Sequence, residues 1–113
     1  MSIKFNKSGY NRAVEIIDNG LEVEHDTNNW EEVKPTVDEE LQYIDTHSLD
    51  EYGEWFLGIR SEPELKDDIK KFVYPFGDFK VLHKSALLSS KKLAEKNKDN
   101  EIAGKIDELL DMI

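Results

Sequence analysis

The chain has 113 residues, a length typical of a single small domain with a modest core. It contains no cysteine, which excludes disulfides, thiolate catalysis and cysteine-ligated zinc or iron–sulfur sites. Fifteen basic and twenty-five acidic residues give a formal net charge of −10, which disfavours direct binding to nucleic acid. The chain begins without an apolar run of signal-peptide length, and no window is long enough to span a membrane. We therefore expect a soluble cytoplasmic protein.

The N-terminal segment predicts a helix over residues 8–19, with Ser8 as its N-cap. Gly20 stands where a left-handed residue ends such a helix. Residues 21–25 alternate and predict a short extended piece, and a polar loop then leads to Trp30. The apolar stripe of the predicted helix comprises Tyr10, Ala13, Val14 and Ile17.

Two capping patterns occur in the middle of the chain. Thr36 and Glu39 form the pattern of a capping box directly after a proline, which predicts a helix over residues 36–47. Ser48 and Glu51 repeat it and predict a shorter helix that ends near the next glycine. The buried side of the first of these helices is predicted to carry Val37, Leu41 and Ile44.

Two apolar runs, at residues 55–59 and 72–76, predict strands that pair as a small ribbon. A helical segment beginning at Ser61-Glu62-Pro63-Glu64 is expected to connect them. In the second run Phe72, Tyr74 and Phe76 alternate, which places three aromatic side chains on one face.

The second run ends in a corner. Pro75 cannot donate to a central ladder, so the strand is an edge strand or ends there. Gly77 is expected to supply a permissive backbone angle. Asp78 is expected to be the N-cap of a helix that begins at Phe79.

The C-terminal region predicts two helices, over about 79–96 and from residue 99 or 100 to the end, joined by a short link as an antiparallel hairpin. The predicted fold is therefore a single α+β domain, mainly α, with four to five helices around a small two-stranded β element. The stripe of the first helix comprises Phe79, Leu82, Ala86 and Leu93, and that of the second Ile102, Ala103, Ile106, Leu109, Leu110 and Ile113.

The residues offer little catalytic or metal-binding chemistry. The histidines at 25, 47 and 83 are too far apart to form a helical zinc motif. On a helix, Asp78 and His83 would lie about 140° apart, so they would not form an acid–base pair; His83 is expected to be partly buried or to donate to a nearby carboxylate. Three serines at 85, 89 and 90 lie mid-helix without a nucleophile elbow, and the glycines are isolated. We predict no catalytic residue, no metal and no cofactor, and an enzyme is disfavoured.

Charge is unevenly distributed along the chain. Residues 1–60 carry five basic and fourteen acidic residues, whereas residues 61–113 carry ten and eleven. The leading hypothesis is a non-enzymatic binding or regulatory module that docks on a basic partner protein. One alternative is a small-ligand or enzymatic site at the Gly77–Lys84 corner, and another is an acidic mimic of nucleic acid. The candidate acidic surface comprises Glu31, Glu32, Glu39 and Glu40, and the candidate binding corner comprises Tyr74, Asp78, His83 and Lys84.

Three segments stand out as a pattern: Tyr52-Gly53-x-Trp55-x-Leu57-Gly58, the run Tyr74-Pro75-Phe76-Gly77-Asp78-Phe79-x-x-Leu82-His83-Lys84, and the closing segment from Ile102 to Leu109. This pattern resembles that of a family of small uncharacterised bacterial proteins. The resemblance covers nearly the whole chain. This sequence departs from the family's pattern at Lys84, where an arginine is usual, and at Phe72, where a tyrosine is usual. A lysine cannot make the bidentate contact with an anion that an arginine makes, so such a contact is less expected here. The family has no agreed activity, so the resemblance implies a single domain and a shared corner but no function.

Overall fold

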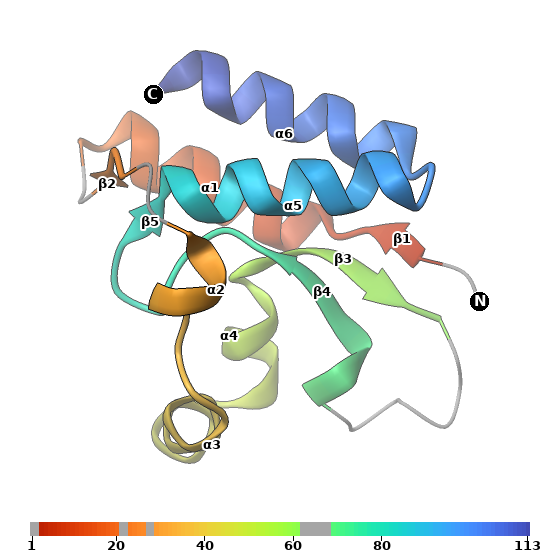
Figure 1. Ribbon diagram of the computed structural model, residues 1–113. Coiled ribbons are helices and arrows are strands. Elements are labelled where there is room, and N and C mark those ends of the chain that lie inside the picture. Colours follow the sequence, from red (N-terminus) through yellow and green to blue (C-terminus); the bar gives the residue numbers. More distant parts are fainter. Residues whose placement is uncertain (1–2, 21–22, 27–28, 62–68) are drawn as a thin grey trace.

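Three short strands form an antiparallel sheet in the order β1-β3-β4 (Figure 1). They are β1 (Ile3–Phe5), β3 (Phe56–Arg60) and β4 (Phe72–Pro75). The computed structural model describes residues 3–20, 23–26, 29–61 and 69–113. The pairing of β3 with β4 confirms the predicted ribbon, and β1 adds a third strand from a segment too short to show a period-two pattern.

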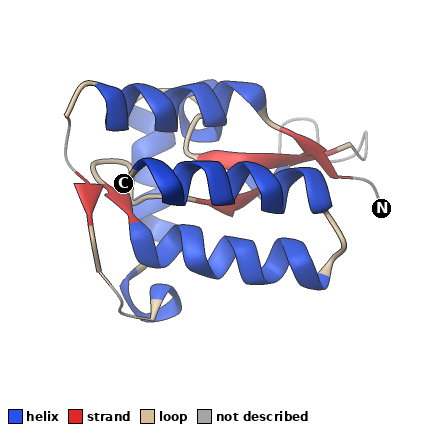
Figure 2. Ribbon diagram, turned by 90° about the horizontal axis from the view of Figure 1, so that it is seen from above, coloured by secondary structure: helices blue, strands red, loops and turns tan. Residues whose placement is uncertain are grey.

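Three helices cover one face of this sheet. They are α1 (Lys7–Asp18), α5 (Lys84–Lys96) and α6 (Asn100–Met112). α1 packs against β3 and α5 against β4, and α6 packs on α5 and α1. In Figure 2, which looks down on the helices, α6 is seen between the other two, and Figure 1 shows it farther from the strands. The predicted C-terminal hairpin is confirmed, because α5 and α6 run antiparallel and pack along their length (Figure 1).

Shorter elements lie on the other side of the sheet and at its edge. They are α2 (Trp30–Val33), α3 (Val37–Thr46), α4 (Leu49–Gly53) and the 3₁₀ turn η2 (Ile69–Lys71). A separate two-residue strand, β2 (Val23–Glu24), pairs in parallel with β5 (Leu82–His83). The described residues thus form an α+β fold that is mainly α, as predicted, with six α-helices rather than four or five.

Local sequence rules account for several of these boundaries. The Thr36 hydroxyl accepts from the Glu39 N–H and the Glu39 carboxylate accepts from the Thr36 N–H, so the predicted capping box is present. The Ser48 hydroxyl caps α4 by accepting from the Glu51 N–H. Gly20 has the expected left-handed backbone, with φ of 64°. Ser8 was expected to cap α1, but the helix begins earlier, and the side chain of Asn6 before it donates instead to two carbonyls of the α4–β3 region.

The core lies between the sheet and the three long helices. Phe72, Tyr74 and Phe76 are all buried, but Tyr74 has φ of 63°, which interrupts the regular alternation predicted for residues 72–76. Trp55 is also buried, but it precedes β3 instead of belonging to the strand. Its indole stacks on the Phe76 ring at a centroid distance of 5.4 Å, so the two apolar runs meet at the corner.

The predicted buried faces of two helices need correction. In α3 the side chain of Ile44 is partly buried, but Val37 is 61% exposed and Leu41 is 50% exposed. In α5 the side chain of Leu93 is 45% exposed. An apolar stripe identifies an amphipathic helix but does not say whether the stripe meets the core. The predicted helical segment after Ser61 falls largely on residues 62–68, outside the described residues.

Candidate functional site

The corner after β4 is a turn, and the prediction of a helix beginning at Phe79 is wrong. The Asp78 carboxylate accepts from the backbone N–H of Lys80 at 3.1 Å and of Val81 at 2.8 Å. These are the bonds of a capping aspartate, but Phe79 has φ of 73°, which no residue of a right-handed helix can adopt. The chain therefore continues into β5, and α5 begins only at Lys84.

Gly77 has a steric role at this corner. A Cβ atom on this residue would lie 2.5 Å from the Val81 carbonyl oxygen and 2.6 Å from the Trp55 ring. We expected Gly77 to supply an unusual backbone angle, but its φ is not positive. The residue is needed because the indole of Trp55 and the returning chain both pack against its backbone.

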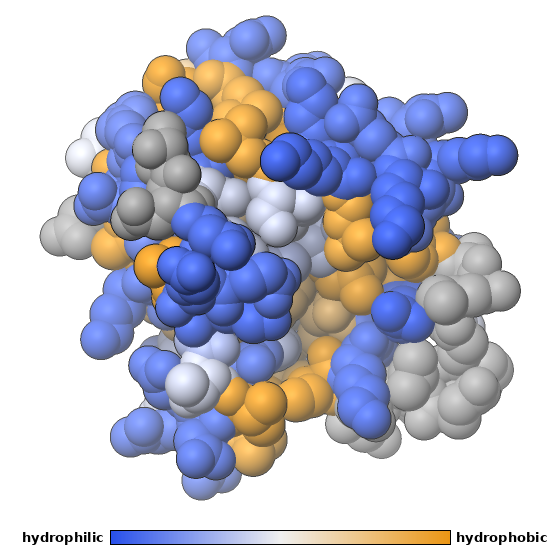
Figure 3. Space-filling view, in the orientation of Figure 1, coloured by the Kyte–Doolittle hydropathy of each residue, from blue (hydrophilic) through white to orange (hydrophobic). Residues whose placement is uncertain are grey.

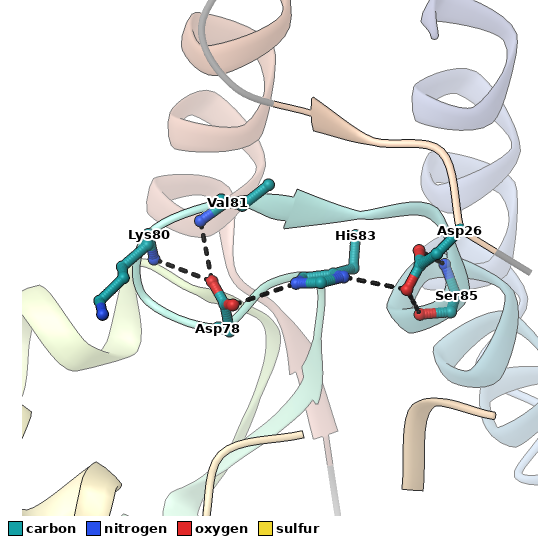
Figure 4. Close-up of polar contacts among 6 residues, drawn as sticks. All are labelled: Asp26, Asp78, Lys80, Val81, His83 and Ser85. Carbon is teal, nitrogen blue, oxygen red and sulfur yellow. Dashed lines mark hydrogen bonds and ion pairs between the residues drawn. The ribbon is translucent and has the colours of Figure 1, made fainter. Parts of the chain in front are cut away.

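His83 joins this turn to a distant part of the chain (Figure 4). Its Nε2 lies 3.1 Å from Asp78 Oδ2, and its Nδ1 lies 3.0 Å from Asp26 Oδ2. The side chains of His83 and Asp26 are 14% and 7% exposed. The prediction that Asp78 and His83 do not pair is wrong, because it assumed a helix where the chain forms a turn and a strand.

Both ring nitrogens of His83 face carboxylate oxygens. A neutral imidazole carries only one N–H, so in that form one nitrogen would direct a lone pair at an oxygen lone pair. The arrangement is satisfied when the ring is protonated and both nitrogens donate. Burial of the ring opposes its charge, but the hydrogen bonds to Asp26 and Asp78 outweigh burial and raise the pKa of His83 above 6.5.

Asp26 reaches the N-terminus of α5 from the loop after β2. Its carboxylate accepts from the Ser85 N–H at 3.1 Å and from the Ser85 hydroxyl at 2.8 Å. His83 is the N-cap residue of α5 but makes no side-chain cap bond, so Asp26 supplies that acceptor instead. Burial acts to raise the pKa of Asp26, but the bonds from Ser85 and His83 together lower it.

Asp78 is the more accessible of the two carboxylates, with 31% of its side chain exposed. Burial acts to raise its pKa, and the Val81 N–H, the His83 ring and the Lys80 N–H lower it further than burial raises it. Trp30 of α2 covers the His83 ring at a centroid distance of 5.4 Å. We name the group Asp26, Asp78, His83 and Ser85 the His83 clamp, because it fastens the loop after β2, the 78–81 turn and the start of α5 together.

The clamp is poorly suited to acid–base catalysis. A general base needs a free nitrogen within reach of the substrate proton, and both nitrogens of His83 are engaged. Of the other predicted corner residues, Tyr74 is 1% exposed, and its hydroxyl donates to Asp99 far from the clamp. Burial and that bond raise the pKa of Tyr74 to about 12. Lys84 is the first residue of α5, so the structure brings only Asp78 and His83 of the four together.

The four residues of the candidate acidic surface lie on α2 and α3. Glu31 and Glu32 are exposed, and Glu31 pairs with Lys34 at 2.7 Å. The other two have structural roles, because Glu39 completes the capping box and Glu40 accepts from the Tyr52 hydroxyl. Residues 29–54 contain nine acidic side chains and one lysine, so most of the net charge of −10 is concentrated there.

A groove lies between α2 and α3 on one side and β4 and η2 on the other. We name it the α2–β4 groove. Its volume is about 400 Å³. Figure 3 looks onto this face and shows hydrophobic surface beside the hydrophilic surface of α2. The apolar residues that line it are Trp30, Pro35, Val37, Tyr52, Phe56, Ile69, Phe72, Pro75 and Phe79.

A second, more polar hollow of about 610 Å³ lies on the other side of Phe79. Phe79 lines both hollows, and its ring stacks on Tyr43 of α3 at a centroid distance of 4.7 Å. The polar side chains around the second hollow include Arg12, Asp78 and Lys80. The His83 clamp therefore holds the 78–81 turn in place, and Phe79 of this turn lies between the two hollows.

Comparison with protein-family models, with curated proteins and with solved structures found no match. In the part of the chain that the structure describes, no group of three or more histidine and carboxylate side chains could hold a metal ion. No helix within the same residues is long and apolar enough to cross a membrane.

Sequence reasoning missed the contributions of Asp26 and Trp30. Asp26 lies 57 residues before His83, and nothing local indicates the contact. The only indication was that a partly buried histidine needs a carboxylate or carbonyl partner. Trp30 followed a polar loop without a periodic pattern around it, although a large aromatic residue in such a position is seldom left exposed.

Proposed function

We propose that this chain is a non-enzymatic binding module that docks a basic partner protein through α2, α3 and the α2–β4 groove. The observation that carries the proposal is an apolar groove of about 400 Å³, one wall of which is formed by α2 and α3 of the most acidic segment of the chain. Buried aromatic rings form its floor, and Val37 at its rim is 61% exposed. Hot spots of protein interfaces are apolar anchors in such pockets, surrounded by a polar rim.

The charge of the same segment selects the partner. Nine acidic side chains and a single lysine over residues 29–54 attract a positively charged surface and repel an acidic one. Within this segment Glu31 and Glu32 are the two residues of the predicted acidic surface whose carboxylates make no capping bond or buried hydrogen bond. They therefore act mainly on the encounter with the partner, while the groove sets how long the complex lasts.

Site-specific photo-crosslinking in the native host tests the proposal. A photoreactive amino acid at Val37 is expected to yield one discrete protein adduct. The matched control carries the same amino acid at Met112, which is 40% exposed at the end of α6, on the opposite side of the sheet from the groove. We expect no equivalent adduct from Met112, and the Val37 adduct should be lost when Glu31→Lys and Glu32→Lys are combined. Equal adducts from both positions would contradict the proposal.

A second candidate is a small-ligand site at the corner, supported by the hollow of about 610 Å³. Asp78 and Lys80 of the turn and Arg12 of α1 are among the charged groups that line it. A ligand there would contact Tyr43, which lines this hollow and not the α2–β4 groove, and would change its NMR signals. A partner in the α2–β4 groove would instead shift Trp30 and Val37.

We also propose that the module acts in a bacterial cytoplasm. The lack of cysteine is compatible with a reducing compartment, and the corner segment resembles that of small bacterial proteins. Fractionation of the native host with an antibody against the chain tests this placement.

A further inference from the structure

The outer face of α3 carries one leucine that the described chain leaves half exposed. Leu41 is 50% exposed, and Asp38 and Asp45 stand three residues before it and four residues after it. Residues at these spacings share one side of a helix. We name Asp38, Leu41 and Asp45 the outer face of α3. It points away from the inner side, where Tyr43 meets Phe79 and Glu40 meets Tyr52.

The outer face of α5 has the same pattern with opposite charge. Leu88 is 36% exposed, and Lys84 and Lys92 stand four residues before it and four after it. In the described residues neither lysine forms a salt bridge, whereas Lys91 pairs with Asp107 of α6. We name Lys84, Leu88 and Lys92 the outer face of α5.

We propose that two copies of this chain associate, with the outer face of α3 on one copy packed against the outer face of α5 on the other. Leu41 would meet Leu88, and the two aspartates would meet the two lysines. Because each leucine is flanked by a charge on both sides, the pairs form whether the two helices run parallel or antiparallel. This contact uses Asp38, Leu41 and Asp45, whereas docking of a basic partner in the α2–β4 groove uses Val37 and Glu40 of the same helix. Val37 lies one helical turn before Leu41, so the two contacts are made by different residues but adjoin each other.

The size of the contact sets its strength. One helix pair buries less than the roughly 1,200–2,000 Å² of a standard stable interface, so the association is weak and depends on concentration. Each copy also carries a net charge of −10, which opposes association at low salt. The local aspartate–lysine pairs must overcome this general repulsion, and that requirement makes the proposal testable by charge reversal.

Sedimentation equilibrium from about 10 μM to 1 mM protein at about 0.15 M salt tests the proposal. The first variant combines Asp38→Lys with Asp45→Lys, and the second combines Lys84→Glu with Lys92→Glu. We expect each alone to weaken self-association by about tenfold or more, because like charges then face each other. An equimolar mixture is expected to recover wild-type association to within about threefold, since Lys on α3 then faces Glu on α5.

A matched control separates local pairing from net charge. Asp18→Lys combined with Asp111→Lys changes the net charge from −10 to −6, the same change as the first variant, at exposed positions outside both faces. It is expected to associate at least as well as the wild type. Circular dichroism and thermal melting of every variant establish that it is folded before its association is compared.

Three results would overturn the proposal. The first is a wild-type chain that stays monomeric at about 1 mM. The second is unchanged association in either charge-reversed variant. The third is a mixture of the two folded variants that fails to recover association. A different self-contact would give the second or third result, so it would not be mistaken for this one.

Discussion

His83 is the residue on which the corner depends. Its ring receives two carboxylates, one from the 78–81 turn and one from the loop after β2, and both hydrogen bonds require a protonated ring. Because the pKa of His83 is higher in the folded protein than in the unfolded chain, the protonated ring stabilises the fold. This stabilisation is complete below the pKa of the unfolded chain, about 6.5, and is lost as the pH rises through the pKa of the folded protein. The two aspartates have lowered pKa values, so they stabilise above about 3.8 and lose that effect as the pH falls.

We therefore expect the clamp to stabilise the fold most between about pH 4 and 6.5. His83→Gln should lower the free energy of unfolding by roughly 1–3 kcal/mol at pH 6, and by less as the pH rises above the folded pKa of His83. Denaturant unfolding of both proteins at pH 6, 7.5 and 9 checks this. A difference between them that is the same at all three pH values would show that His83 is not held as a charged group.

Asp78 has two roles: it accepts hydrogen bonds from backbone N–H groups of the turn, and its charge faces the ring of His83. Asp78→Ser would keep an acceptor for the backbone N–H groups of the turn but would remove the charge that faces His83. Serine would therefore replace Asp78 at little cost only if this residue were a simple N-cap.

Trp55 is the second residue whose role the structure defines. It is 4% exposed and packs on Phe76, Phe79 and the backbone of Gly77. Trp55→Ala is expected to cost about 3–5 kcal/mol in urea unfolding, as for other large aromatic residues in cores. Leu93→Ala is the control, since Leu93 is 45% exposed, and it should change stability by about 0.5 kcal/mol or less. Equal effects of the two substitutions would contradict this account of the corner.

At the scale of elements, two glycines in helices have opposite roles. A Cβ on Gly9 of α1 would lie 1.8 Å from the carbonyl oxygen of Phe56, so this glycine lets α1 rest directly on β3. Gly104 lies inside α6, where an added Cβ would have no atom within 4 Å. Gly9 is therefore required for packing, whereas Gly104 only lowers the stability of α6.

Gly9→Ala is therefore expected to destabilise the fold by more than about 1 kcal/mol, through displacement of α1. Gly104→Ala should stabilise it by roughly 0.5–1 kcal/mol, because alanine is the better helix former and meets no obstacle. Thermal melting of the two variants beside the wild type measures both. Effects of the same sign would contradict the close seating of α1 on β3.

Sequence patterns predicted where helices and strands lie better than they predicted which side chains those elements contact or bury. The capping box at Thr36, the stop at Gly20 and the C-terminal hairpin were predictable, because each depends on a few neighbouring residues. The turn at residues 78–81 was not predictable, because an aspartate that caps a helix and an aspartate that closes a turn accept hydrogen bonds from the same backbone N–H groups.

The site itself could be predicted only in part. Asp78 and His83 were both candidates, but their partner Asp26 lies far away in the sequence and joins them only through the pairing of β2 with β5. The exposure of Val37 and Leu41 was also beyond prediction, because helical periodicity is the same whether a stripe meets the core or solvent.

At the scale of the whole molecule, charge is divided between two regions. The segment 29–54 is strongly acidic, and between residues 80 and 98 six lysines accompany a single glutamate. Despite that basic helix, we expect no retention of duplex DNA at physiological salt, because the net charge of −10 opposes approach to phosphates. A mobility-shift assay checks this. Retention that is lost when Lys80, Lys84 and Lys91 become Glu would make α5 a nucleic-acid surface.

The most direct test of the docking proposal is the association rate of the partner captured at Val37. We predict that the rate constant falls steeply as salt rises from about 50 to 150 mM, because exposed charges are screened over about 8–10 Å. The Glu31→Lys, Glu32→Lys variant should associate about tenfold more slowly at low salt, with its dissociation rate and melting temperature nearly unchanged. An association rate that is independent of salt and equal in the two proteins would contradict a partner recruited by the acidic surface of α2 and α3.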